Sequence, residues 1–200
     1  MTLDRFQSLR RAVLGLIMTV SLLVLLVVRS SGQGDLHEYV EAAGLALMAV
    51  GVIGRMWCTL YIGGRKSAEI VAHGPYSISR NPLYLFSAIT IAGVGAQTGS
   101  VVVAVCAMLG CAALFQIVIR REERHLTELF GDSYRAYLGS TPRFWPRFAR
   151  FADAPQLTID TGRLYRTLAD GLFFFLAVPA FELIEQLQKI DVLPVLFTLP

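Results

Sequence analysis

The sequence predicts an all-α, polytopic transmembrane helical bundle of about five spans, built as a single membrane domain over residues 1–200. Two observations support this prediction. Hydrophobic residues make up 54% of the chain and charged residues only 16%, whereas about a quarter of the residues in an ordinary soluble protein are charged. The shortage of charge is concentrated in long uncharged runs, and a helix needs about 20 apolar residues to cross a bilayer.

The first two expected spans are residues 12–28 and 39–60. Residues 12–28 lie between Arg11 and Arg29 and lack a small-residue cleavage pattern followed by polar sequence. We therefore interpret them as a retained anchor and not as a signal peptide. The charged residues of 39–60 lie near its ends, where long side chains reach the interface.

The next two spans, residues 82–97 and 100–119, are expected to form a helical hairpin around the polar turn Thr98-Gly99. Asn81 followed by Pro82 predicts the start of the first helix, with asparagine as the N-cap and proline in the first turn. The second helix then returns antiparallel to the first. Its charged end should therefore lie beside the start of the helix at Pro82.

The C-terminal apolar segment is harder to interpret. Asp170 and Glu182 bracket an apolar run of about ten residues, which Pro179 interrupts. A run that short is more typical of an interfacial or packed segment than of a span. Residues 168–187 remain a candidate fifth span if their acidic side chains face other helices or water.

The basic residues predict an orientation. With four spans, sixteen of the eighteen Lys and Arg residues fall in segments that share one side of the membrane, and such residues collect on the cytoplasmic side. We therefore expect an integral membrane protein with its N-terminus and polar loops in the cytoplasm. The three cysteines lie in apolar stretches without the paired spacing of a zinc site, so no metal is expected. A nucleic acid is not an expected partner either.

A first polar segment precedes the third span and contains His73-Gly74-Pro75-Tyr76 and Arg80-Asn81-Pro82-Leu83-Tyr84. Gly74-Pro75 predicts a turn. The helix that begins at Pro82 turns its free amide groups and positive dipole end toward the cytoplasm, which suits an anionic group. Arg80 adds a fixed positive charge, and the two tyrosines offer aromatic faces for a sulfonium or an adenine ring.

A second polar segment, Arg120-Arg121-Glu122-Glu123-Arg124-His125, follows the fourth span. Because of the hairpin, one of the two glutamates should point back toward the first segment. The simpler interpretation of the arginines is that they anchor the helix at the inner leaflet. Tyr134, Tyr137 and Trp145 could likewise form an interfacial aromatic belt.

Together these motifs resemble the isoprenylcysteine carboxyl methyltransferase and phospholipid methyltransferase superfamily of integral membrane enzymes. The resemblance covers roughly Ile70 to Pro146 and includes Glu122-Glu123, Phe130-Gly131 and Pro142. It implies S-adenosylmethionine as methyl donor in a cytoplasmic pocket, and a lipophilic acceptor that arrives through a gap between helices. The expected partners are therefore a lipophilic or small-molecule methyl acceptor and membrane lipid. By the same resemblance, Arg120 or Arg121 and Arg143 would face the acceptor and serve catalysis. The cofactor would be held by His73, Gly74, Pro75, Tyr76, Arg80, Asn81, Tyr84, Glu122 and Glu123.

One position departs from the family, which commonly has histidine where this chain has Asn81. Asparagine can donate a hydrogen bond but cannot carry a proton near neutral pH. No isolated base is evident in the sequence, which favours a carboxylate or an easily ionised thiol as acceptor over an amine. Two alternatives remain: a sterol-reductase-like enzyme that uses NADPH, and a non-catalytic membrane scaffold.

Overall fold

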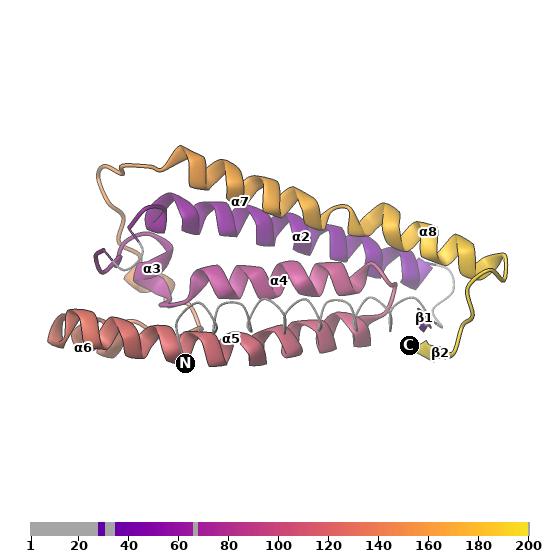
Figure 1. Ribbon diagram of the computed structural model, residues 1–200, viewed down its shortest axis with the longest axis horizontal. Helices are drawn as coiled ribbons and strands as arrows, with labels where there is room; N and C mark the ends of the chain where they lie inside the picture. The colour runs from indigo at the N-terminus through magenta and orange to yellow at the C-terminus, as the bar shows by residue number, and fades with distance from the viewer. Residues whose placement is uncertain (1–27, 31–34, 66–67, 200) are drawn as a thin grey trace, which may run out of the picture.

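The computed structural model describes residues 28–30, 35–65 and 68–199 of the chain, and Figure 1 shows their arrangement as a bundle of long helices. The described part is mostly helical, which confirms the predicted fold class. The first expected span lies outside the described residues except for Val28. That residue begins the strand β1 (Val28–Ser30), which pairs in parallel with β2 (Phe197–Leu199).

The centre of the bundle is the contact between α2 (Asp35–Ile62) and α4 (Pro82–Ala96), as Figure 1 shows. Small residues allow these two helices to approach closely. A Cβ atom at Gly51 would lie 2.2 Å from Oγ1 of Thr90, and one at Gly93 would lie 2.6 Å from the carbonyl oxygen of Gly44. Close packing over small residues is a common way for membrane helices to associate, because lipid gives no hydrophobic driving force between them.

The predicted hairpin is present. α4 ends at Ala96, and α5 (Val101–Phe130) runs back along it after a short turn. Ser100 caps α5, and its side chain accepts a hydrogen bond from the amide of Val103 at 3.4 Å. α5 continues eleven residues beyond the expected end of the span at Ile119, so the segment that bears the glutamates is part of the same helix.

The C-terminal segment forms α7 (Thr161–Phe174) and α8 (Ala177–Lys189), which follow one another along α2 in Figure 1. The break between them has a local cause. Pro179 has no N–H to donate to Phe175, and its ring disfavours a helical carbonyl four residues earlier. Pro179 itself lies in the first turn of α8, where an N–H would have no partner within the helix.

Within the part of the chain that the structure describes, three segments are long and apolar enough to cross a membrane: α2, α5 and Thr161–Lys189; α4 is apolar but shorter. Large apolar side chains on these helices are exposed, among them Leu109 and Ile117 on α5 and Phe173 on α7. Soluble proteins rarely expose so much contiguous apolar surface. The chain is therefore an integral membrane protein.

The short elements at the left end of the bundle in Figure 1 come from segments far apart in the sequence. They are α3 (Pro75–Ile78), α6 (Asp132–Ser140) and the 3-10 turn η1 (Phe148–Arg150). Both predicted polar segments lie at this end, which we call the pocket end. The turn between α4 and α5, the end of α8 and the two strands lie at the opposite end.

Candidate functional site

Gly74 shapes the loop that enters the pocket end. Its φ of 57° lies in the left-handed region, and a Cβ atom there would lie within 2.3 Å of the Tyr61 ring. Only glycine tolerates both constraints at low cost. The amide of Gly74 donates to the carbonyl of Ala152 at 2.8 Å. The turn therefore places Tyr76 in the interior and leaves His73 exposed.

A cavity opens at the pocket end between the last turn of α2, the start of α4, α5 and α6. The empty space inside it is about 690 Å³, of which part is open solvent. Apolar and aromatic side chains make up most of its wall, with a few polar groups between them. The lining residues are Ile62, Glu69, Ile70, Val71, Tyr76, Arg80, Asn81, Leu83, Tyr84, Glu122, Glu123, Leu126, Phe130, Tyr134 and Tyr137.

Six of the residues expected to hold a cofactor line this cavity. The structure thus brings together the two polar segments that the hairpin predicted to be neighbours. Five other predicted site residues lie outside the lining, and their roles stay predictions. Gly74 and Pro75 form the turn of the loop, and His73 is exposed beside them. Arg121 is exposed on α5, and Arg143 follows α6.

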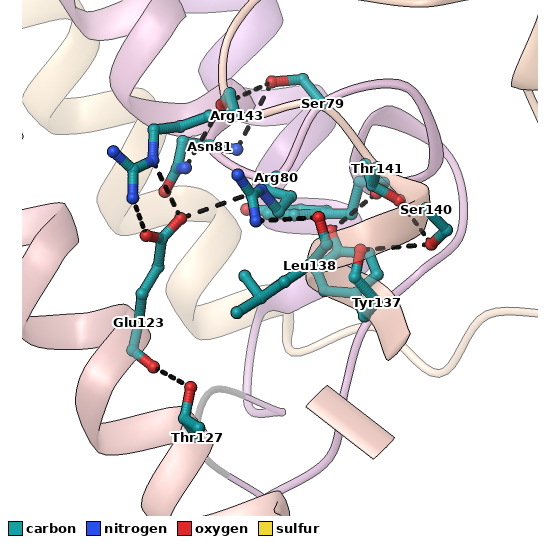
Figure 2. A network of polar contacts seen from close by, with 11 residues as sticks. Ser79, Arg80, Asn81, Glu123, Thr127, Tyr137, Leu138, Ser140, Thr141 and Arg143 are labelled. Carbon is teal, nitrogen blue, oxygen red and sulfur yellow. Dashed lines mark hydrogen bonds and ion pairs between the residues drawn. The ribbon is translucent and has the colours of Figure 1, made fainter. Parts of the chain in front are cut away.

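Glu123 is the centre of an ion-pair network, drawn in Figure 2. Its carboxylate is buried and accepts hydrogen bonds from Nε and Nη2 of Arg143, the first at 3.2 Å. Nε of Arg80 lies 3.8 Å from Oε1 of the same carboxylate. A buried carboxylate is costly unless it is paired, and here two arginines from different segments share it. The shared carboxylate of Glu123 therefore links the start of α4 and the segment after α6 to α5.

Arg80 and Asn81 join the start of α4 to the segment after α6. Nη1 of Arg80 donates to the carbonyl of Leu138 at 3.1 Å, and its backbone amide donates to the carbonyl of Pro142 at 2.8 Å. The side chain of Asn81 donates to the carbonyl of Arg143 at 3.2 Å, as Figure 2 shows. These bonds tie residues some sixty positions apart.

The helix start at Pro82 is confirmed, but the predicted capping by Asn81 is wrong. Asn81 occupies the N-cap position without a side-chain hydrogen bond to the helix. Its amide group is committed to the carbonyl of Arg143, and proline at the first helical position presets the backbone without help. Asn81 therefore acts here as a donor that fixes the neighbouring segment.

Four tyrosines, Tyr76, Tyr84, Tyr134 and Tyr137, line the cavity. The hydroxyl of Tyr137 donates to the carbonyl of Tyr76 at 2.8 Å, and the hydroxyl of Tyr84 donates to Oε2 of Glu122 at 2.8 Å. The hydroxyl of Tyr76 is buried, and within the described part of the chain it has no hydrogen-bond partner. A buried hydroxyl without a partner costs free energy, so a group bound in the cavity would satisfy it.

Burial also sets the ionisation of this wall. It raises the pKa of Tyr76 well above the ordinary value of a phenol. Burial, with the nearby charge of Glu123, raises the pKa of Tyr134 to about 12. The pKa of Tyr137 is raised by burial as well. Tyr76, Tyr134 and Tyr137 are therefore neutral hydrogen-bonding groups and not bases near neutral pH.

Several lining residues had no assigned role in the sequence. Glu69, Leu126 and Phe130 line the cavity from the loop after α2 and from α5. The belt interpretation of Tyr134 and Tyr137 is wrong, because both side chains are buried in α6. Their spacing of three residues, which puts them on one face of a helix, was the available sign. Trp145, in contrast, is 88% exposed.

Comparisons with known proteins place the chain in a family. A family model described as phospholipid methyltransferase matches residues 40–133, which includes both polar segments. A nickel-cobalt-cadmium resistance protein of Alcaligenes xylosoxydans xylosoxydans is 34% identical over 185 residues, covering 90% of this chain and 86% of that protein. A cobalt-zinc-cadmium resistance protein of Cupriavidus metallidurans is 35% identical over 143 residues, covering 70% and 66%. No solved structure matches the chain.

The family match overlaps the region Ile70–Pro146 on which the resemblance rests, extends it upstream to Val40 and ends at Ser133. It therefore includes α4 and the whole of α5, the helices that carry Asn81, Tyr84 and both glutamates of the cavity. The chain belongs to the phospholipid methyltransferase family of membrane proteins, within the isoprenylcysteine carboxyl methyltransferase-like group.

Proposed function

We propose that this chain is an S-adenosylmethionine-dependent methyltransferase that binds its cofactor in the cavity at the pocket end. The observation that carries the proposal is the unpartnered hydroxyl of Tyr76, buried in a cavity lined by both polar segments. Isolated polar groups that converge in an otherwise apolar cavity are the usual form of a small-molecule site. Membership of a methyltransferase family supports the same class of reaction.

The charges of the lining favour a methyl donor over a nicotinamide cofactor. The lining contains three glutamates, Glu69, Glu122 and Glu123, and one arginine, Arg80. Glu69 is paired with Arg65, and Glu123 is paired with Arg80 and Arg143. NADPH carries several phosphate charges, and sites for such groups are usually built from arginines, lysines or helix N-termini. The one arginine of the lining is already paired, whereas S-adenosylmethionine, with a sulfonium and an ammonium group against one carboxylate, has a net positive charge and needs no such cluster of cations.

The start of α4 suits the one anionic group of that cofactor. Asn81, Leu83 and Tyr84 line the cavity, so the first turn of α4 borders it. Helix N-termini favour carboxylates through their free amide groups and the helix dipole. Arg80, directly before this turn, adds a positive charge. We assign the carboxylate to this side, and the ribose and ammonium groups to the glutamates.

Bound in the cavity, the cofactor would supply an electrophilic methyl group on its sulfonium. The residues of this chain would then orient the acceptor and exclude water, and orientation alone can contribute up to about 7–11 kcal/mol to such a reaction. Glu123 is neutralised by two arginines and Glu122 accepts a bond from Tyr84. Neither is an isolated base, which favours a carboxylate or an ionised thiol as acceptor over an amine.

The predicted roles of Arg121 and Arg143 at the acceptor are part of this proposal. The guanidinium of Arg143 is committed to Glu123, so its first effect is to position that carboxylate. Following the basic-residue pattern, we propose that the N-terminus and the pocket end face the cytoplasm. The relatives are named for resistance to nickel, cobalt, cadmium and zinc. We propose that methyl transfer by this chain likewise contributes to metal resistance.

A labelled-methyl assay tests the proposal. Purified full-length protein is incubated with methyl-labelled S-adenosylmethionine and membrane lipids, a prenylcysteine analogue or a small lipophilic carboxylate or thiol, in separate reactions. We expect transfer to at least one acceptor, and a loss of at least tenfold in Tyr76→Phe, because a lost hydrogen bond to a charged group costs about 1.5–3 kcal/mol. Labelling of amine headgroups alone would overturn the acceptor class. Absence of both transfer and cofactor binding would overturn the function.

A further inference from the structure

At the end of the bundle opposite the pocket, three side chains that commonly ligate metals converge from two helices. His37 and Glu41 lie one turn apart on α2, and Glu185 lies on α8. One potential ligand atom from each lies within 4.8 Å of the other two. The sequence separates Glu41 from Glu185 by more than 140 residues, so only the antiparallel course of α8 along α2 brings them together.

The imidazole of His37 lies beside a carboxylate but makes no hydrogen bond within the described part of the chain. Both of its ring nitrogens are buried, and neither makes a hydrogen bond within the described part of the chain. Nε2 lies 3.2 Å from Oε1 of Glu41, which is close enough for an ion pair if the ring is protonated but does not meet hydrogen-bond geometry. A buried nitrogen beside two carboxylates is the arrangement that a cation would complete.

The position of these ligands is held by packing. A Cβ atom at Gly99 would lie 1.9 Å from Nδ1 of His37, so the ring is pressed against the turn between α4 and α5. Nε2 of Gln97 donates to the carbonyl of Glu41 at 3.0 Å and fixes the first turns of α2 to the end of α4. These contacts hold the imidazole ring of His37 and the backbone of Glu41 in place before a metal arrives.

We propose that His37, Glu41 and Glu185 bind a divalent transition-metal cation such as Zn²⁺, Co²⁺ or Ni²⁺. One imidazole nitrogen and two carboxylate oxygens are donors that these ions accept, with water completing the coordination. Ligands at about 2.0–2.2 Å from a tetrahedral ion lie roughly 3.3–3.6 Å apart, so rotation of the glutamate side chains would close the site. Glu182, one turn before Glu185 on α8, adds negative charge.

One contact competes with the metal. Nζ of Lys189 lies 3.0 Å from Oε1 of Glu185, and this lysine side chain is 54% exposed. The site therefore stands between two states: two separate ion pairs, or three ligands on one cation. Removal of the lysine should favour the second state, which gives the proposal an expectation that a purely structural cluster would not share.

The test uses full-length protein in detergent, without a polyhistidine tag, titrated with Co²⁺ and followed by the visible absorption of the bound ion. We expect one Co²⁺ per chain, displaced by Zn²⁺. Glu185→Gln and His37→Gln should weaken binding at least tenfold, the lower end of what metal-site substitutions cost, and Lys189→Gln should strengthen it. The matched control is Glu38→Gln, an exposed glutamate on the same helix turn.

Circular dichroism of each variant shows whether its helices are intact. If His37→Gln does not fold, the result for Glu185→Gln, on the outer helix, is the one that tests the proposal. No Co²⁺ binding by the unaltered chain, or equal binding by Glu185→Gln, would overturn the proposal. The site lies at the far end from the cavity and is independent of the proposed methyl transfer. A chain that binds S-adenosylhomocysteine but no Co²⁺ would therefore leave that function standing.

Discussion

The two ends of the bundle satisfy their polar groups in different ways. At the pocket end, the Glu123 carboxylate is paired with both Arg80 and Arg143, and the buried Tyr76 hydroxyl has no hydrogen-bond partner within the described residues. At the opposite end, the two buried ring nitrogens of His37 make no hydrogen bond within the described residues, although Nε2 lies 3.2 Å from Glu41. One end thus has a complete ion-pair network beside a cavity, and at the other end the side chains of the proposed metal site are only partly paired.

The comparison also shows what a sequence can reveal. The pocket-end residues are contiguous in two short motifs, and a hairpin whose turn was visible in the sequence brings those motifs together. The opposite cluster takes one ligand from α8 and two from α2, and no short pattern links them. Substitutions at the two ends test this difference through stability and cofactor binding.

The largest effect is expected for Glu123→Gln. It leaves Arg80 and Arg143 without their shared carboxylate, and breaking a buried pair costs on the order of 3 kcal/mol, less to the extent that the 35% exposed side chain of Arg143 is solvated. Thermal unfolding in detergent should show a marked fall in Tm. S-adenosylhomocysteine binding should be lost as well.

Two controls frame that result. Glu128→Gln removes an exposed charge on the same helix and should leave Tm nearly unchanged. Glu41→Gln, at the opposite end and without metal, should have a small effect, because its partner His37 makes no good hydrogen bond to it. Equal losses in Glu123→Gln and Glu41→Gln would contradict the contrast between the ends.

The next largest effect is expected for Gly74→Ala. The substitution places a Cβ atom against the Tyr61 ring at a backbone conformation that favours glycine, and strain of this kind costs about 1–3 kcal/mol. Gly139→Ala is the matched control, since nothing lies within 4 Å of its added Cβ atom. It should be neutral or slightly stabilising. A Gly74→Ala protein with unchanged Tm and cofactor affinity would show that the loop is not constrained.

A smaller pair of effects separates binding from stability. Tyr137→Phe loses the hydrogen bond to the carbonyl of Tyr76 and should lower the free energy of unfolding by about 1 kcal/mol. Tyr76→Phe removes a buried hydroxyl without a partner in the described structure, so it should leave the free energy of unfolding unchanged or raise it, and it should weaken S-adenosylhomocysteine binding. The reverse pattern, with Tyr76→Phe unstable and binding normally, would mean that the hydroxyl is structural.

The smallest effect concerns alkaline pH. The pKa of Tyr134 is raised to about 12 in the folded protein, above the ordinary value of about 10. The unfolded chain therefore binds fewer protons between these values, and this contribution to stability is complete below pH 10 and lost as pH rises to 12. Ultraviolet titration should show a late tyrosinate fraction that Tyr134→Phe reduces. Ionisation of Tyr134 at the same pH as the exposed tyrosines would contradict its burial.

Much of this fold could be predicted from the sequence, because uncharged runs, the Thr98-Gly99 turn and Pro82 mark helices and their ends directly. The pocket was predictable where the motifs carried it. Asn81 was misread because capping is a local rule, and the competing acceptor, the carbonyl of Arg143, lies 62 residues away. Tyr134 and Tyr137 were misread for a similar reason, since burial depends on packing that composition does not describe.

The central claim is that the cavity at the pocket end binds a cationic methyl donor. Isothermal titration of the full-length protein with S-adenosylhomocysteine and, separately, with NADPH tests it most directly. The predicted result is one binding event per chain for S-adenosylhomocysteine, weakened in Tyr76→Phe, and no heat of binding for NADPH. Binding of NADPH alone would contradict the account and support a reductase.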